Sequence, residues 1–168
     1  TFNMDIDALR KAITPKTRAI VPVHLFGQCA NMEEIMDIAR EHNLYVIEDA
    51  CQAIGSDYTF SDGTIKKAGT IGHLGTTSFF PSKNLGCYGD GGAIFTDDDA
   101  LATRLRFIVN HGMHVRYYHE EIGVNSRLDS IQAAILDIKL KHLNEYAAAR
   151  QKAAAAYNKA FGGNPHLQ

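Results

Sequence analysis

The stretch Leu44-Tyr45-Val46-Ile47-Glu48-Asp49 decides the fold class of this chain, because four apolar residues run without a break into two acids. Such a run is typical of a parallel strand that is buried on both faces, and we expect it to end at the acids. The residues before it recur at the spacing of one helix face, after an N-cap candidate at Asn31. They are Met32, Ile35, Met36 and Ala39. The stretch therefore predicts a helix followed by a buried strand.

The same alternation of helix and strand extends to both sides of this stretch. Asp5 is placed to cap a short helix over 6–13, and residues 19–23 read as an apolar strand interrupted late by Pro22. Residues 58–75 are rich in glycine and predict a loop with one short strand at most. The remaining expected elements are strands over 76–80 and 92–96 and helices that begin near 97 and 127. This alternation predicts an α/β fold.

The composition excludes several classes of protein. The chain has 168 residues, 17 of them Lys or Arg and 19 Asp or Glu, and its net charge of −2 argues against a nucleic-acid-binding protein. No apolar run approaches the roughly 20 residues of a membrane-spanning helix, so we expect no membrane contact. Three scattered cysteines give no disulfide framework, and we expect a cytoplasmic location. Because the first residue is not Met, we expect the chain to be cut from a longer protein.

Two charged residues are candidates for chemistry. Asp49 ends the buried strand, and ligands of open α/β sheets bind beyond the carboxyl ends of strands, where a carboxylate can pair with a cationic ligand group. The alternative is a helix cap or turn residue. Lys83 has Phe, Pro and Leu nearby in the sequence, and desolvation favours the neutral amine that attacks carbonyls. The alternative is an exposed loop lysine.

Two further motifs point to no cofactor or metal by themselves. The segment 86–92 is rich in glycine but is neither a dinucleotide-binding fingerprint nor a Walker A loop, and it predicts a tight turn with positive φ angles. His111, His114 and His119 lack the spacing of a zinc-binding helix. We therefore expect surface or substrate-contacting histidines and no metal site.

Five segments occur in an order that resembles one family. They are residues 23–28 (VHLFGQ), 47–53 (IEDACQA), 78–86 (SFFPSKNLG), 89–93 (GDGGA) and 123–129 (GVNSRLD). Together they resemble the DegT/StrS-type family of nucleotide-sugar aminotransferases that depend on pyridoxal 5'-phosphate (PLP). The resemblance runs from about residue 20 to residue 161, and Cys51 stands where alanine is usual.

The resemblance implies a fold of the aspartate aminotransferase type, which has a large α/β domain with a mixed seven-stranded sheet and a smaller domain. Members of the family are considerably longer than this chain. We therefore expect a fragment of the large PLP-binding domain, with a mostly parallel mixed sheet flanked by helices. Residues 1–126 would be the central part of that domain. Residues 127–168 would be a long helical segment leading toward the small C-terminal domain.

The resemblance also implies roles for four residues around the cofactor. Lys83 would form a Schiff base with the cofactor aldehyde and later move a proton between the donor Cα and the cofactor C4′. Asp49 would pair with the pyridinium nitrogen, which makes the ring an electron sink. Gln52 would contact the cofactor near its phenolic oxygen, and Ser78 would donate its hydroxyl to the phosphate.

Two more residues are implied to act across a subunit boundary. Asn125 would reach the phosphate of a neighbouring subunit, and Arg127 would meet the sugar nucleotide, where it suits a carboxylate. This implies a homodimer with shared active sites. An apolar stripe on the following helix is open to two interpretations, a dimer contact or a face turned to its own core. It consists of Leu128, Ile131, Ile135 and Ile138.

The subclass follows from Lys83, because a dehydratase branch of the family has histidine at this place. The resemblance thus implies transamination of a nucleotide-linked keto-sugar, 3-keto or 4-keto, with glutamate as the amino donor. The 3-keto branch is the one most resembled. Two other classes stay open: a non-catalytic regulatory or interaction domain that retains the fold, and a Rossmann-type oxidoreductase domain.

Overall fold

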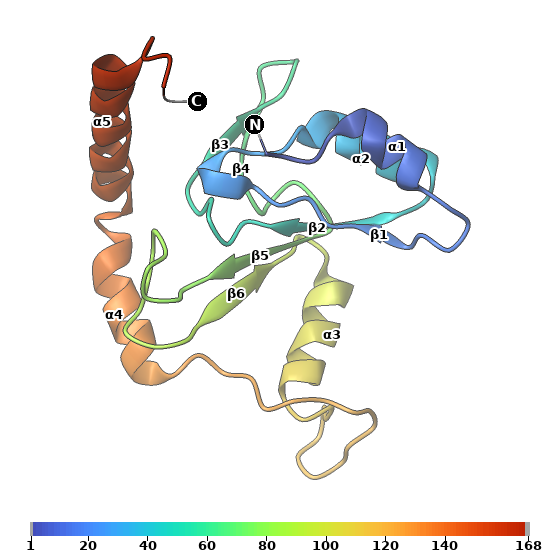
Figure 1. Ribbon diagram of the computed structural model, residues 1–168. Coiled ribbons are helices and arrows are strands. Elements are labelled where there is room, and N and C mark those ends of the chain that lie inside the picture. Colours follow the sequence, from blue (N-terminus) through green and yellow to red (C-terminus); the bar gives the residue numbers. More distant parts are fainter. Residues whose placement is uncertain (1, 167–168) are drawn as a thin grey trace.

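The computed structural model describes residues 2–166 and has a four-stranded sheet at its centre, in the order β1-β2-β5-β6 (Figure 1). Three strands run parallel, namely β1 (Ala19–Ile20), β2 (Tyr45–Asp49) and β5 (Leu74–Ser78). The edge strand β6 (Gly92–Phe95) is antiparallel to β5. The predicted α/β fold with a mostly parallel mixed sheet is confirmed.

Strand β1 is shorter than the predicted strand over 19–23. It ends at Ile20, and Val23 rejoins the sheet only through an isolated bridge to Asp49. Pro22 has no N–H to donate to a ladder, although its carbonyl accepts the N–H of Asp49 at 2.9 Å. A short 3₁₀ turn, η1 (Leu25–Gly27), follows.

Helix α2 (Met32–Glu41) packs on β1 and β2 and builds the main core, and helix α1 (Ile6–Ala12) packs against α2 with Ile6 and Leu9 partly buried. Asp5 caps α1 as predicted, because its Oδ1 accepts the N–H of Ala8 at 2.7 Å. The buried face of α2 is shifted slightly from the predicted one, since Ile38 is fully buried and Met36 is not. Each fully buried Ile or Met side chain stabilises the fold by about 1.5–3 kcal/mol.

The prediction that β2 is buried on both faces is wrong. Val46 and Glu48 are fully buried on the face of the main core, but Tyr45 on the opposite face is 59% exposed. The register pairs Asp49 with Thr76 and Thr76 with Ile94, and Ile94 is 48% exposed. Because directly paired residues share a face, Asp49 lies on the less covered side of the sheet.

The region between β2 and β5 contains two strands where the sequence predicted a loop with one at most. β3 (Asp57–Thr59) and β4 (Ile65–Lys67) pair as an antiparallel hairpin. After β6, Asp98 caps α3 (Asp99–Val109), which confirms the expected acid-capped helix start. A pocket of about 820 Å³ lies between β6 and α3.

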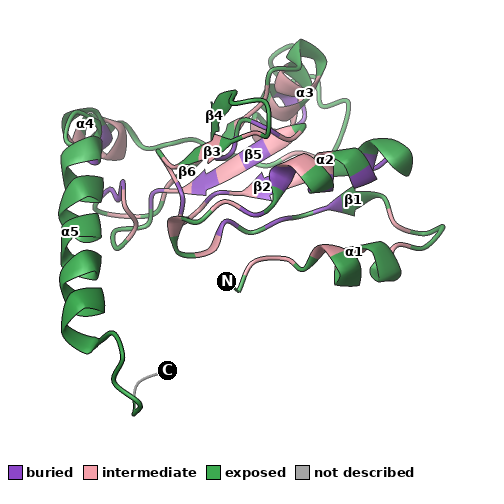
Figure 2. Ribbon diagram, turned by 90° about the horizontal axis from the view of Figure 1, so that it is seen from above, coloured by how far each residue is buried: buried purple, intermediate pink, exposed green. Residues whose placement is uncertain are grey.

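The predicted long helix after residue 127 is two helices, α4 (Ser130–Leu140) and α5 (Leu143–Phe161). Leu136 and Leu143 are buried in a second apolar cluster, whereas α5 is exposed along most of its length (Figure 2). Of the apolar stripe, Leu128, Ile131 and Ile138 are 40%, 70% and 63% exposed, so most of it does not face this chain's own core. None of the helices described for residues 2–166 has the length and apolar character needed to cross a membrane.

Candidate functional site

The carboxyl end of β2 places Asp49 at the edge of the sheet beside β5. Its Oδ1 accepts the N–H of Cys51 at 3.0 Å, and its backbone is held on both sides, by Thr76 of β5 and by the bridge to Val23. Strand pairing on two sides leaves the Asp49 backbone little freedom. The sheet therefore fixes the direction in which the Asp49 side chain leaves the backbone.

The Cys51 thiol lies within range of the charges of both Asp49 and Lys83. Burial raises the pKa of Cys51, and the hydrogen bond and negative charge of Asp49 raise it further, while the positive charge of Lys83 lowers it. Both charges thus act on one sulfur atom, although 34 residues separate them in the sequence. A carboxylate and an amine near one point are a pair that can hold a proton and pass it on.

A pocket of about 500 Å³ opens beside Lys83. Gln52 lines the same pocket, and its Oε1 accepts the N–H of Phe26 at 2.9 Å. Arg150 of α5 lines it as well and donates to Asn84 Oδ1 at 2.8 Å. Three of the predicted residues, Asp49, Gln52 and Lys83, therefore lie in one neighbourhood.

Ser78 ends β5, five residues before Lys83, and is half-buried. Its Oγ accepts the N–H of Phe80 at 3.2 Å, a turn contact that does not use the hydroxyl hydrogen. The serine can therefore donate to an acceptor at the start of the loop that bears Lys83.

Asn125 and Arg127 lie elsewhere in this chain. Both are exposed, and Arg127 Nε donates to Asn125 Oδ1 at 3.0 Å. Asn125 also bridges Asn110 at the end of α3, and neither residue lines the pocket beside Lys83. The fold of one chain thus does not bring them to Lys83.

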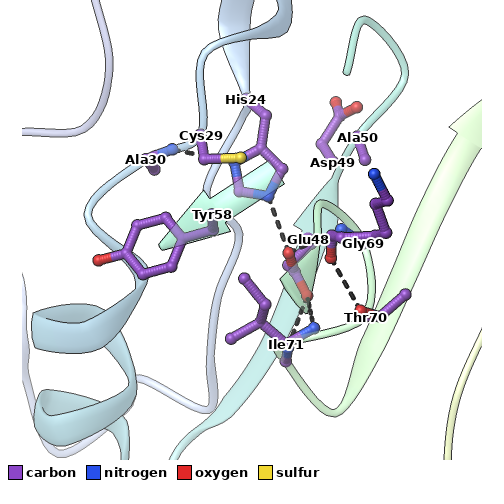
Figure 3. A network of polar contacts seen from close by, with 12 residues as sticks. His24, Cys29, Ala30, Glu48, Asp49, Ala50, Tyr58, Gly69, Thr70 and Ile71 are labelled. Atoms are coloured by element: carbon purple, nitrogen blue, oxygen red, sulfur yellow. Dashed lines mark hydrogen bonds and ion pairs between the residues drawn. The ribbon is translucent and has the colours of Figure 1, made fainter. Parts of the chain in front are cut away.

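A buried carboxylate next to Asp49 is the feature that the sequence analysis missed (Figure 3). Glu48 and His24 are both fully buried, with His24 Nε2 at 2.8 Å from Glu48 Oε2. The same oxygen accepts the N–H of Gly69 at 2.8 Å, and Oε1 accepts those of Ile71 and Gly72 at 2.6 and 2.5 Å. Four donors thus surround the two carboxylate oxygens.

The hydrogen bonds decide the protonation of this network. His24 Nδ1 accepts the N–H of Ala30 at 3.1 Å, so the ring hydrogen lies on Nε2 and is donated to Glu48. Burial alone would raise the pKa of Glu48, but the bonds from His24 and from the three backbone N–H groups outweigh it and lower the pKa. Glu48 is therefore a buried carboxylate anion.

A sequence signal for this network exists. Successive strand residues point to opposite faces, so an acid directly before a site-facing Asp49 must point into the core. Figure 3 shows the two side chains pointing in opposite directions from β2. A charge in the core requires hydrogen-bond donors, and a histidine such as His24 can supply one.

The glycines of the segment 86–92 are required for a different reason from the predicted one. None of its glycines has a positive φ, so the expected positive-φ turn is wrong. Glycine is required there by close approach. A Cβ on Gly91 would lie 2.9 Å from Leu128 Cδ1, and one on Gly86 would lie 2.4 Å from the Pro81 carbonyl oxygen.

The three histidines of the segment after α3 do not converge on one point. His114 stacks on Phe107 with ring centroids 4.2 Å apart, while His111 and His119 meet edge to face at 6.5 Å. Within residues 2–166, no group of three or more His, Cys, Asp or Glu side chains could hold a metal ion.

Comparison with known proteins gives a match over the whole chain. The model of the DegT/DnrJ/EryC1/StrS aminotransferase family matches residues 1–168. A UDP-2-acetamido-2-deoxy-3-oxo-D-glucuronate aminotransferase of Pseudomonas aeruginosa is 52% identical over 158 residues, which are 94% of this chain and 43% of that protein. A pleiotropic regulatory protein of Geobacillus stearothermophilus is also 52% identical, over 95% of this chain and 41% of that protein.

Solved structures agree with this match. The S. venezuelae protein DesV, in complex with a ketimine intermediate, has a TM-score of 0.88 and 44% identity over 97% of this chain and 43% of its own. Other matched structures contain bound hydrated PLP or the cofactor PMP. The chain thus spans about two fifths of the length of the proteins it matches.

Proposed function

This chain belongs to the DegT/DnrJ/EryC1/StrS aminotransferase family, and from that premise we propose that the protein transfers an amino group to a nucleotide-linked keto-sugar with PLP as cofactor. The observation that carries the proposal is that Lys83 lines one pocket with Gln52, three residues after Asp49, whose carboxylate accepts the N–H of the intervening Cys51. It supports an amine and a carboxylate close enough to act on the same small ring.

The residues present fit this cofactor. PLP supplies an aldehyde that an amine can capture and a ring that accepts the electron pair released at the amino donor. Lys83 offers the amine and Asp49 the carboxylate for the ring nitrogen. Gln52 lies in the same pocket as Lys83, and Ser78 stands at the start of the Lys83 loop with a hydroxyl hydrogen for a phosphate oxygen.

In the proposed mechanism, each residue holds or moves a proton at a stated atom. Lys83 would hold the cofactor through Nζ, and its amine, once free, would take up and return a proton as the general base and acid of the site. Asp49 would hold a proton on the ring nitrogen, and the ring would then accept the electron pair released at the donor carbon. Gln52, which lines the pocket beside Lys83, would contact the cofactor near its phenolic oxygen.

The substrate class is proposed more finely from one relative and one residue. The P. aeruginosa relative is named for a 3-oxo sugar acid linked to UDP. Arg127 offers a planar guanidinium that binds a carboxylate through two parallel hydrogen bonds. We therefore favour a nucleotide-linked 3-keto sugar over a 4-keto sugar, with glutamate as the amino donor.

The assembly proposed is a homodimer with two shared sites. Asn125 and Arg127 are exposed and lie outside the Lys83 pocket of their own chain, as residues that serve a neighbouring subunit would. The exposed stripe of Leu128, Ile131 and Ile138 is an apolar surface that follows these two residues directly in the sequence. Complementation tests this: inactive Lys83→Ala and Arg127→Ala subunits, mixed and exchanged, should recover about a quarter of native activity. A dead mixture with proven exchange contradicts shared sites.

The test of the function itself is covalent. Borohydride reduction of the full-length protein with PLP, followed by peptide mass mapping, should place a pyridoxyl group on Lys83. Lys83→Ala is the control and should carry none. A pyridoxyl group on Lys66 or Lys67 instead would contradict the assignment of the lysine.

A second candidate function is favoured by the G. stearothermophilus relative, which is named a pleiotropic regulatory protein. A regulatory domain that retains the fold would bind no pyridoxyl group at any lysine and would show no yellow absorption with PLP. The Rossmann-type oxidoreductase alternative receives no support from the family match. The division of the chain at residue 126 and the cytoplasmic location stay predictions.

A further inference from the structure

Three side chains of α4 and α5 bind alternate residues of the loop that carries Lys83. Arg150 Nη1 donates to Asn84 Oδ1 at 2.8 Å, and Lys139 Nζ donates to the Gly86 carbonyl oxygen. Gln132 Oε1 accepts the N–H of Tyr88 at 2.8 Å. The contacts fall one, three and five residues after Lys83, so that they follow the loop along its length.

Apolar packing supports the same contact from below. Leu136 of α4 and Leu143 of α5 are buried in one cluster with Phe79, Leu85 and Cys87, which flank or belong to the loop. A buried leucine keeps a helix at a fixed distance from the chain it covers. The polar and apolar contacts thus both hold the segment 79–88 against α4 and α5.

The glycines of the segment 86–92 allow α4 to come this close. A Cβ on Gly89 would lie 3.1 Å from Nε2 of Gln132 in α4, and one on Gly91 would lie 2.9 Å from Cδ1 of Leu128, which lies just before α4. The motif that the sequence presents as a simple turn is therefore also the floor on which α4 lies. Larger residues there would push the helix away from the loop.

The loop needs such external support because it leaves the sheet. The Cys87 N–H binds the Phe79 carbonyl oxygen at 2.8 Å and closes the loop, with Lys83 at its middle. Within it, the Lys83 N–H binds the Phe80 carbonyl oxygen at 2.9 Å. These bonds shape the loop but do not fix where it stands relative to Asp49 on β2.

We propose that the α4–α5 pair positions Lys83, with Lys139 and Gln132 as positioning residues that hold its loop at the correct distance from Asp49. The inference rests on the proposed role of Lys83 and deepens it. The two helices then set the geometry of the active site, in addition to any connection they make to further parts of the protein. A shift of the loop by about 1 Å would misplace the Lys83 amine and slow proton transfer while leaving substrate binding unchanged.

The chain offers a matched control for the test. Lys139 and Lys141 lie two residues apart at the end of α4, but Lys141 Nζ binds Asp137 at 3.3 Å, where both side chains are largely exposed. We therefore compare Lys139→Met with Lys141→Met in the full-length protein with PLP bound. Lys139→Arg retains the donor and serves as the rescue variant.

Two measurements are needed: amide hydrogen exchange of the peptide over 82–91, with and without PLP, and steady-state kinetics. Loss of a hydrogen bond from a charged donor should accelerate loop exchange about tenfold. We expect kcat to fall about tenfold in Lys139→Met with the KM for the nucleotide sugar unchanged. Lys139→Arg and Lys141→Met should behave as the parent protein.

Three results would overturn the proposal: unchanged exchange in Lys139→Met, faster exchange with unchanged kcat, or equal effects in Lys139→Met and Lys141→Met. Should Lys139→Met fail to fold, Gln132→Leu is judged by the same two measurements. Failure of the proposed function is separate, because it appears as the absence of a pyridoxyl group on Lys83 after borohydride reduction, whereas loop exchange is measured without any turnover.

Discussion

Asp49 and Lys83 are held in opposite ways. Asp49 ends a strand that is paired on both sides, and directly beneath it the buried Glu48 carboxylate binds His24 and three backbone N–H groups. Lys83 stands in a loop outside the sheet, supported by side chains that follow it by 49 or more residues. The Asp49 carboxylate thus depends on a strand that the core supports directly, whereas the Lys83 amine depends on helices that come later in the chain.

This difference separates two kinds of damage. Disturbing the support of Asp49 breaks a buried polar network, so the cost appears in the free energy of unfolding. Disturbing a single side-chain contact to the Lys83 loop leaves its buried apolar contacts in place, so the cost appears first in the position of one amine. The variants below test this separation.

The largest effect is expected at Asp49 itself. Asp49→Asn removes the charge that would keep the ring nitrogen protonated, and we expect the transamination rate to fall about a thousandfold, or ~4 kcal/mol. The asparagine oxygen can still accept the Cys51 N–H, so the urea midpoint should stay close to that of the parent protein. A rate near that of the parent protein would mean that Asp49 is only a turn residue.

The next effect concerns the support of Asp49. Glu48→Leu leaves His24 and three backbone donors buried without an acceptor, and we expect a loss of about 3–5 kcal/mol in the free energy of unfolding, measured by urea denaturation. Glu41→Leu is the matched control, because Glu41 pairs with Arg10 at 3.4 Å on the surface and should cost at most about 1 kcal/mol. Equal losses of unfolding free energy in the two variants would contradict a larger stabilising role for the buried His24–Glu48 pair.

A smaller effect is expected where Leu128, just before α4, meets the glycine segment of the Lys83 loop. Gly91→Ala places a methyl group 2.9 Å from Leu128 Cδ1 and should cost about 1–3 kcal/mol, because one of the two must shift. Adding Leu128→Ala should restore part of this loss by removing the opposing atoms. A double variant no more stable than the sum of the single variants would place the strain elsewhere.

The smallest effect is a pH dependence. The pKa of Glu48 is lowered in the fold, so its contribution to stability is complete above the ordinary glutamate pKa of about 4.3 and is lost as the pH falls through the lower folded value. The thermal stability of the parent protein should therefore fall more steeply from about pH 5 to about pH 3 than that of Glu48→Gln. Parallel curves for the two proteins would show that Glu48 does not titrate in this range.

Local patterns in the sequence determined most of the elements. Period and capping placed α1, α2 and α3, and apolar runs placed β2, β5 and β6, because these signals act over a few residues. Errors arose where a distant contact decides. The exposure of Tyr45 and the second strand of the β3–β4 hairpin both depend on what packs against the segment.

For the site, the sequence by itself determined which residues have reactive groups and where strands end, and so it identified Asp49 and Lys83. It also held the family resemblance that the comparisons confirmed. Only the tertiary structure decided that both charges act on Cys51, that Glu48 turns inward to four donors, and that α4 and α5 hold the Lys83 loop. The physical reason is range: propensity and period act between neighbours in sequence, whereas charge, burial and hydrogen bonding act between neighbours in space.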